Sequence, residues 1–249
     1  MQIEVCAFSI ESCLNAQRAG AYRIELCGGV YEGGTTPSYG LIQRARSVLS
    51  IQLYVMIRPR GGDFCYDDEE LNVMRLDIQA AKKSGADGVV LGLLKPDGKV
   101  DIERTKELVD LAKPMGVTFH RAIDVASDPF EALEAIIQTG AERILTSGQQ
   151  NTAVEGKELL QQLVEKSGGR IEIMAGSGVN ADNALLLAET GVNALHLTGK
   201  SVRRGAMIYR KEDVSMASVL PADEYEIIYT NEANIKRLIK KLEGEAMNF

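Results

Sequence analysis

The sequence lacks the features of membrane, secreted and nucleic-acid-binding proteins. No apolar stretch reaches about 18 residues, and the opening Met1 to Cys6 has neither the basic nor the apolar region of a signal peptide. We therefore expect a cytoplasmic protein with no membrane partner. The chain has 28 Lys and Arg against 35 Asp and Glu, with no long run of either sign. This balance argues against a phosphate-neutralising face, so we expect no nucleic-acid partner.

Cysteine is scarce and its spacing excludes two common sites. The four cysteines, Cys6, Cys13, Cys27 and Cys65, form no Cys-x-x-Cys pair, which argues against a zinc knuckle or a thioredoxin motif. In a cytosolic domain of this size we expect them to be thiols. No Gly-x-Gly-x-x-Gly turn follows Cys6, where an open dinucleotide-binding sheet would carry one.

The chain does contain a repeated unit: a helical stretch, a small residue, glycine, and then a short β-branched run. The glycines of the clearest copies are Gly20, Gly85, Gly140 and Gly191, and each reads as the end of a helix that leads into a strand. Counting looser copies, we expect eight strands. Their cores begin at Ile3, Ile24, Leu53, Val89, Val117, Ile144, Ile171 and Ala194.

The spacing of these strands leaves room for one helix and two loops in each interval. Eight such units in 249 residues predict one α/β domain, a (β/α)8 TIM barrel over residues 1–249 with its strands within about 2–199. A doubly wound open sheet is the alternative. We expect residues 200–230 to form a long connection, acting as a lid or an oligomer contact, and residues 232–242 to form a closing helix. A homodimer is consistent with this tail.

Alternation within the strands predicts a polar barrel interior. If Ile3 and Val5 face the helices, Glu4 and Cys6 face inward. The second strand places Arg23, Glu25 and Cys27 inward by the same rule. Buried charges are costly unless they pair, so a structural ion-pair network is one interpretation of the lower residues, Glu4 and Arg23. Residues at the C-terminal ends of the strands are different, because TIM-barrel active sites lie at that mouth.

Several chemically capable residues fall at this mouth. The only two histidines, His120 and His196, follow or end predicted strands, as does Arg58. Asp124 lies shortly after His120. We predict a catalytic set in which Glu25, His120 and Asp124 transfer protons. Arg58 and His196 complete this predicted set.

A second predicted set would bind an anion. The glycines after the seventh strand open a helix and allow backbone N–H groups to approach a phosphate, although they could equally serve as tight turns. The loop after the third strand adds a second arginine between proline and glycines. The predicted anion-binding residues are Arg60, Ser147, Gly176, Ser177, Gly178, Thr198 and Gly199.

Longer motifs resemble those of one family. The segments Ile3-Glu4-Val5-Cys6, Arg23-Ile24-Glu25-Leu26-Cys27, Gly33-Gly34-Thr35-Thr36-Pro37-Ser38-Tyr39-Gly40, Tyr54 to Phe64 with its Arg58-Pro59-Arg60-Gly61-Gly62 core, Thr118-Phe119-His120-Arg121-Ala122 and Leu145-Thr146-Ser147-Gly148 are similar to the CutC family of copper homeostasis proteins. The resemblance covers roughly residues 2–200. It implies a cytoplasmic (β/α)8 barrel associated with copper handling.

The resemblance also implies a metal site at Cys6 and Cys27, because thiolates suit Cu(I), with Met56 or Cys65 as a possible third sulfur ligand. Two hypotheses therefore stand. In one, the protein binds copper, as Cu(I), through Cys6 and Cys27. In the other, the partner is a small anionic molecule, and the protein is an enzyme for a phosphorylated or carboxylated substrate. A metal ion could also assist such a reaction.

Overall fold

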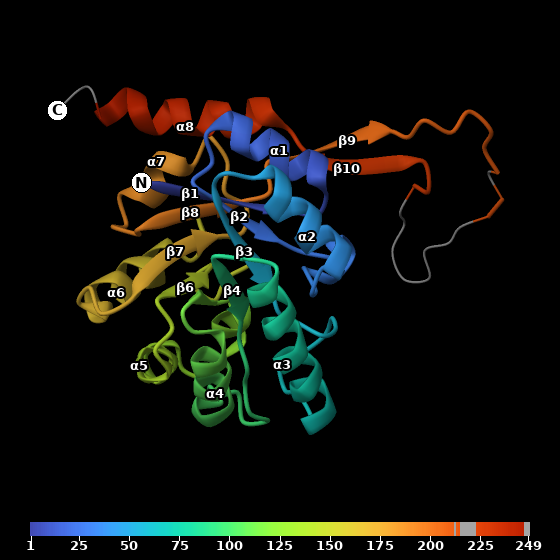
Figure 1. The fold of residues 1–249 in the computed structure, drawn as a ribbon. Helices are drawn as coiled ribbons and strands as arrows, with labels where there is room; N and C mark the ends of the chain where they lie inside the picture. Colours follow the sequence, from blue (N-terminus) through green and yellow to red (C-terminus); the bar gives the residue numbers. More distant parts are fainter. Residues whose placement is uncertain (212, 215–222, 247–249) are drawn as a thin grey trace.

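Eight parallel strands close into a barrel that helices surround (Figure 1). This is a computed structural model that describes residues 1–211, 213–214 and 223–246. The barrel strands are β1 (Gln2–Ala7), β2 (Arg23–Leu26), β3 (Gln52–Met56), β4 (Gly88–Leu91), β5 (Gly116–Phe119), β6 (Arg143–Thr146), β7 (Glu172–Gly176) and β8 (Ala194–Leu197). Each strand pairs with the next, and β8 pairs with β1, so the predicted (β/α)8 barrel is confirmed.

Helices surround the barrel, and some of them end at glycines that the sequence pattern predicted. They are α1 (Ile10–Ala19), α2 (Tyr39–Val48), α3 (Asp68–Lys83), α4 (Ile102–Ala112), α5 (Pro129–Thr139), α6 (Lys157–Ser167), α7 (Ala184–Ala188) and α8 (Glu232–Ala246), with 3-10 turns at Val30–Glu32 and Arg121–Val125. Gly20 and Gly140 end α1 and α5 at φ of 95° and 84°, where a side chain would be strained. Within the described residues, no helix is both long and apolar enough to cross a bilayer.

Two layers of apolar packing confirm the predicted alternation. The outer layer fills the space between strands and helices and includes Ile3, Val5 and Ile24. Separate apolar clusters lie inside the barrel; the larger contains Cys6, Cys27, Tyr54, Met56 and Val90. The smaller contains Leu145, Met174 and Ala194. Charged side chains are buried in the interior as well, since those of Glu4 and Arg23 are 0% and 1% exposed. The barrel interior is therefore charged, as expected.

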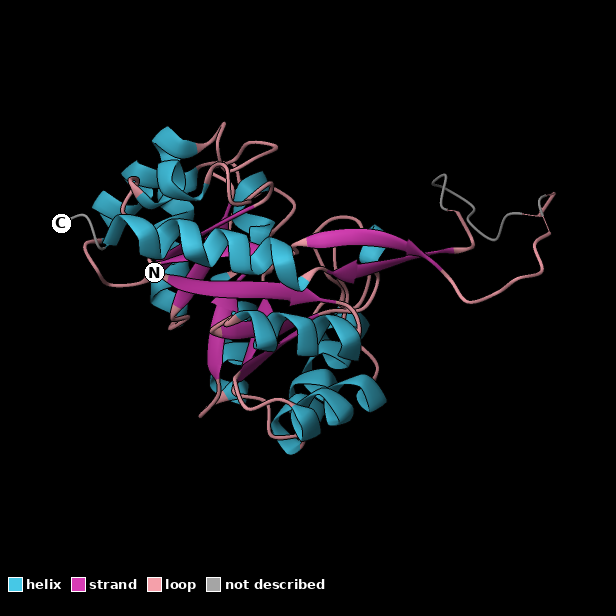
Figure 2. Ribbon diagram, turned by 90° about the horizontal axis from the view of Figure 1, so that it is seen from above, coloured by secondary structure: helices cyan, strands magenta, loops and turns pink. Residues whose placement is uncertain are grey.

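The segment after β8 differs from the expected plain connection. Strands β9 (Lys200–Arg204) and β10 (Glu226–Thr230) form an antiparallel pair that projects from the barrel (Figure 2). Thr230 fixes the base of this pair to α1, because its N–H donates to Ser12 Oγ and its carbonyl accepts from Asn15 Nδ2. Part of the expected connection, residues 212 and 215–222, lies outside the described residues. The expected closing helix is α8, which packs on α1 and α7.

Gly156 sits in a contact that no side chain can share. A Cβ there would overlap the backbone oxygen of Ser147 and lie 2.8 Å from Gly148 Cα. Overpacking of this kind costs about 1–3 kcal/mol, so Gly156→Ala is expected to lower the free energy of unfolding by that amount, measured by urea denaturation. Gly40→Ala is the control, because nothing lies within 4 Å of a Cβ there. Equal stability of the two variants would contradict this prediction.

Candidate functional site

A cavity of about 730 Å³ opens at the C-terminal mouth of the barrel. Residues from both predicted sets line it: Cys6, Glu25, Arg58, His120, Ser177, Gly178, His196, Thr198 and Gly199. Other predicted site residues are not among the described residues of its wall: Cys27, Arg60, Asp124, Ser147 and Gly176. The structure thus brings together four of the five predicted catalytic residues, one of the two predicted metal ligands and four of the seven predicted anion-binding residues at one cavity.

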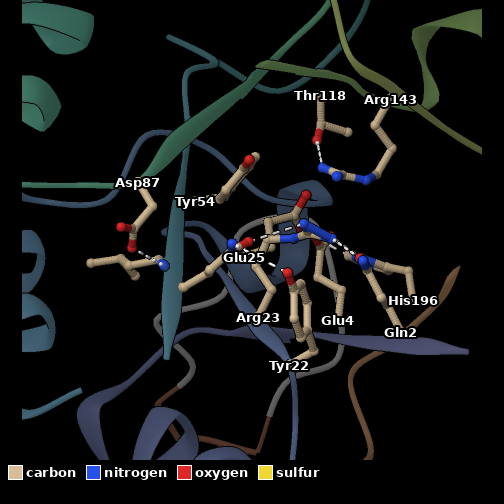
Figure 3. Close-up of polar contacts among 12 residues, drawn as sticks. Gln2, Glu4, Tyr22, Arg23, Glu25, Tyr54, Asp87, Thr118, Arg143 and His196 are labelled. Carbon is tan, nitrogen blue, oxygen red and sulfur yellow. Dashed lines mark hydrogen bonds and ion pairs between the residues drawn. The ribbon is translucent and has the colours of Figure 1, made fainter. Parts of the chain in front are cut away.

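The floor of the site is a chain of buried charges on three adjacent strands (Figure 3). Glu4 on β1 lies level with Arg23 on β2 and with His196 on β8, because these residues are partners in the strand registers. Arg23 Nε donates to Glu4 Oε2 at 2.6 Å, and Glu4 Oε1 lies 2.8 Å from His196 Nδ1. Both carboxylate oxygens of Glu4 are therefore engaged, and the carboxylate fixes the orientation of the imidazole.

Above this floor, two thiols and a carboxyl group lie around His196. Cys6 Sγ is 3.7 Å from Cys27 Sγ, and Glu25 Oε2 is 3.6 Å from both Cys27 Sγ and His196 Nε2. One potential ligand atom from each of Cys6, Glu25 and His196 lies within 4.8 Å of the others, and all three residues are buried. The sequence predicted the sulfur pair at this place but did not predict that His196 and Glu25 would face the same sulfur.

Cys6, Glu25 and His196 shift one another's pKa values. The hydrogen bond with Cys27 is the main reason that the pKa of Cys6 is lowered to about 6, and His196 lowers it further against the effect of burial. Burial lowers the pKa of His196, but the charge of Glu25 and the hydrogen bonds to Cys6 and Glu4 raise it well above 6.5. Burial and the neighbouring Cys6 raise the pKa of Glu25 well above 4.5. The lowered pKa of Cys6 and the raised pKa of His196 favour a thiolate beside an imidazolium.

His120 and Arg58 also line the cavity, and the pKa of His120 is lowered, unlike that of His196. Burial lowers the pKa of His120 to about 3, and the positive charge of Arg58 lowers it in the same direction. The Arg58 guanidinium donates to the carbonyls of Glu32 and Gly34 at 2.7 and 2.8 Å and to that of Gly62 at 2.9 Å. Arg58 thus joins the loop after β2 to the loop after β3, and it lines the cavity.

The pKa values of the two histidines should therefore lie on opposite sides of 6.5. At about pH 7 we expect His120 to be neutral, since its pKa of about 3 lies far below, and His196 to be protonated, since its pKa is raised. The measurement is the pH dependence of the two imidazole Cε1–H signals by NMR, assigned with His120→Asn. A midpoint near the ordinary value of 6.5 for both histidines would contradict the described environments.

Asp124 lies away from the cavity, inside the loop network after β5 and β6. Its carboxylate accepts from Arg121 Nε at 2.7 Å, from Thr146 Oγ1 at 2.5 Å and from the backbone N–H groups of Ser147 and Gln149. Ser147 Oγ lies in the same network, 2.9 Å from Asp124. These contacts are those of a carboxylate that joins two loops, and they leave Asp124 poorly placed for the proton transfer that we predicted.

Arg60 also points away from the predicted anion. It forms an ion pair with Glu70 at 2.5 Å and another with Asp63 at 3.1 Å, and it stacks on Tyr66. Gly176 has a packing role, since a Cβ there would lie 2.5 Å from Leu145 Cδ1. The sequence could not separate these two residues from cavity residues, because strand alternation fixes the face of a side chain but not its partner in a loop.

The anion side of the cavity contains two cations outside the predicted set of anion-binding residues, and one of them, Lys200, directly follows the predicted Thr198 and Gly199. Lys200, from β9, and Arg237, from α8, line the cavity together with Ser177, Gly178 and Gly199. Ser177 has a φ of 80° and its Oγ donates to the Asn151 carbonyl, so this turn is held open toward the cavity. The signal that could have indicated these cations is their place after the last barrel strand and in the closing helix.

Comparison with known proteins identifies close relatives of the whole chain. The CutC family profile matches residues 1–201. A CutC family protein of Bacteroides fragilis is 48% identical over 241 residues, covering 96% of each chain. The human copper homeostasis protein cutC homolog is 44% identical over 237 residues, covering 95% of this chain and 87% of the human protein.

A solved structure of a CutC protein has the same fold. CutC from Streptococcus agalactiae superposes with a TM-score of 0.76 at 38% identity, over 80% of this chain and 98% of that one. An aldolase structure superposes with a TM-score of 0.62 at 17% identity, which shows the barrel fold alone. The sequence matches and the barrel agree with the predicted resemblance, and this chain belongs to the CutC family.

Proposed function

We propose that this protein acts in copper homeostasis by binding Cu(I) as cargo at Cys6 and Cys27, with His196 as the third ligand. The observation that carries the proposal is the 3.7 Å separation of Cys6 Sγ and Cys27 Sγ inside a buried pocket. Two metal–sulfur bonds of about 2.3 Å, the length of a zinc–thiolate bond, can span that separation. No backbone movement is then needed to bring the sulfurs to one ion.

The donor types favour Cu(I) over harder cations. Thiolate and imidazole suit Cu(I), whereas the carboxylate oxygen that Glu25 offers suits harder ions. Glu4 supplies the outer support that a metal-bound imidazole needs, since its carboxylate holds His196 Nδ1 at 2.8 Å and leaves Nε2 facing the sulfur. The residues present therefore fit a soft monovalent ion.

Of the two further sulfurs considered, only one lies nearby. Met56 packs in the same inner cluster as Cys6 and Cys27. Cys65 lines a separate cavity with Tyr66 and Arg104, so we do not include it in the copper site. We propose the cytoplasm as the place of action, because all four cysteines are free thiols and the proposed ion is the reduced form of copper.

Competitive titration of the purified protein tests this proposal. Under anaerobic, reducing conditions, the protein should remove one Cu(I) per chain from a coloured Cu(I) chelator, and X-ray absorption should show sulfur neighbours. Cys65→Ser is the matched control and should bind as the wild type does. Transfer of no Cu(I), or of Cu(I) bound only by nitrogen and oxygen, would overturn the proposal.

A second candidate function is an enzyme for a small phosphorylated or carboxylated substrate. It is supported by a cavity of about 730 Å³ that presents Lys200 and Arg237 beside the open turn at Ser177 and Gly178. Phosphate sites of TIM barrels commonly lie at the loops after strands seven and eight. Ribose 5-phosphate should raise the melting temperature of the wild type but not of Lys200→Ala/Arg237→Ala; an equal response of both would count against this candidate.

We also propose that the chain forms a homodimer through the projecting β9–β10 segment. Met207, Ile208 and Tyr209 are 60%, 96% and 72% exposed there, and exposed apolar groups of this kind mark contact surfaces. Sedimentation velocity should show a dimer for the wild type and a monomer for Ile208→Asp. A monomeric wild type at high concentration would reject the proposal.

A further inference from the structure

Two buried N–H groups in the cavity wall have no hydrogen-bond acceptor. They are His120 Nε2 and Arg58 Nε, neither of which has a partner among the described residues. His120 is 4% exposed and Arg58 is 6% exposed, and both residues line the main cavity. A buried donor without an acceptor costs about 1–3 kcal/mol, so two in one wall require an explanation.

The contacts of His120 show that its free nitrogen is a donor. Its Nδ1 accepts the backbone N–H of Ala122 at 3.2 Å, so the proton of the neutral ring must be on Nε2. The ring packs closely against the backbone of Gly92, where a Cβ would lie 2.5 Å from Nδ1. His120 therefore presents one N–H group in a set direction.

Arg58 is fixed in the same way. Three hydrogen bonds to loop carbonyls occupy its terminal nitrogens, and these bonds leave Nε as the unpartnered donor. The acceptors that the described residues offer to the Arg58 guanidinium are these loop carbonyls, which carry no net charge. Such a cation favours an anionic ligand.

The side chain of Phe64 contacts both residues. The ring of Phe64 lies 4.9 Å from the His120 ring and 5.1 Å from Arg58 Cζ, measured between ring centroids and from the centroid to Cζ. The backbone of Phe64 is anchored by the N–H of Leu94, which donates to its carbonyl at 2.9 Å. Because Phe64 is only half-buried and itself lines the cavity, a turn of its side chain would uncover both donors without moving the loop.

From this geometry we propose that Arg58 Nε and His120 Nε2 bind the carboxylate of a small organic acid in the cavity, with Phe64 as the movable wall of this subsite. The proposal deepens the second candidate function, because it names the class of its ligand. It uses other residues than the copper site, which is built on the sulfurs of Cys6 and Cys27.

The environment favours a carboxylate over a phosphate at this position. One cation and one neutral N–H group match the single charge of a carboxylate, whereas a phosphate dianion would leave charge unmatched. The neighbouring wall is apolar, with Phe8, Met56 and Phe64 in the lining, so it suits the carbon body of an organic acid. The cations suited to a phosphate, Lys200 and Arg237, lie on elements that follow β8.

NMR can test the subsite directly because the chain has only two histidines. Malonate is the probe, and the Cε1–H signal of His120 should shift with saturable dependence on malonate while that of His196 stays in place. Inorganic phosphate at equal concentration should shift it at least about tenfold more weakly, which corresponds to 1.4 kcal/mol. A His120 signal that malonate does not move, or that phosphate moves equally, would overturn the proposal.

Variants separate this result from a change of fold and from the other proposals. In Arg58→Lys the charge stays but Nε–H is lost, and the malonate shift of His120 should weaken at least about tenfold. Phe64→Ala keeps both donors and should bind malonate at least as tightly as the wild type; loss of binding in this variant would contradict a covering role. Cu(I) affinity should be unchanged in His120→Asn, and ribose 5-phosphate binding should still depend on Lys200 and Arg237 if only the carboxylate subsite fails.

Discussion

Replacing Arg23 with leucine is expected to lower the free energy of unfolding by about 3–5 kcal/mol, the cost of breaking a buried ion pair from one side. Glu4 has a fully buried side chain and would lose its guanidinium partner at 2.6 Å. Urea denaturation of wild type and variant at neutral pH gives this difference. The result would show that the polar floor of the barrel is integral to its stability.

Two controls distinguish this effect from general loss of charge. Arg170→Leu removes an ion pair with Glu134 whose side chains are 46% and 51% exposed, and it should change stability by less than about 1 kcal/mol. Glu4→Leu/Arg23→Leu removes both charges and should be less destabilised than Arg23→Leu alone, because no unpaired carboxylate remains. If Arg23→Leu cost no more than Arg170→Leu, the ion pair would not have the importance assigned to it.

The pH dependence has a defined sign. Burial raises the pKa of Glu4, but the hydrogen bond to His196 and the charges of His196 and Arg23 lower it below 4.5 overall. The folded-state pKa is therefore depressed, so this carboxylate contributes stability above 4.5 that is lost as the pH falls through the lower folded value. In Arg23→Leu one source of the depression is absent, and the stability difference from the wild type should narrow below about pH 4.5.

Replacing Cys6 with serine is expected to weaken Cu(I) binding by at least about 100-fold, since loss of an outer-shell contact alone can cost 10–100-fold. Cys6 is the sulfur shared by the site: it lies 3.7 Å from Cys27 Sγ and within 4.8 Å of ligand atoms of His196 and Glu25. Cys27→Ser removes a sulfur that contacts fewer of these groups and should weaken binding less. Chelator competition gives the affinities.

The affinity should also fall as the pH is lowered. The pKa of Cys27 is raised well above 9.0 by burial and by Cys6, and that of His196 is raised by Glu25, so both must lose protons when the ion binds. A plot of log affinity against pH should therefore have a positive slope around pH 7. The control Cys65→Ser should leave both the slope and the affinity unchanged. An equal loss of Cu(I) affinity in Cys6→Ser and Cys65→Ser would contradict the assigned site.

The local sequence pattern was sufficient to predict the barrel and to predict which strand residues face its interior. Helix-ending glycines such as Gly20 and Gly140 marked the junctions, and period-two alternation placed Glu4 and Cys6 inside, because both signals depend only on neighbours along the chain. The sequence pattern did not predict the paired strands β9 and β10 after Thr198. Their residues are mostly exposed, so they carry little apolar alternation to mark them.

What the sequence alone determined is therefore the eight-stranded repeat, the polar interior and the mouth position of the two histidines. Only the tertiary structure decided which of these groups meet: His196 faces Cys6 and Glu25, while Asp124 contacts Thr146, Arg60 pairs with Glu70, and Cys65 lines another cavity. The physical reason is that strand periodicity fixes the face of each side chain, whereas barrel closure, strand register and loop path fix its distance from side chains far away in the sequence.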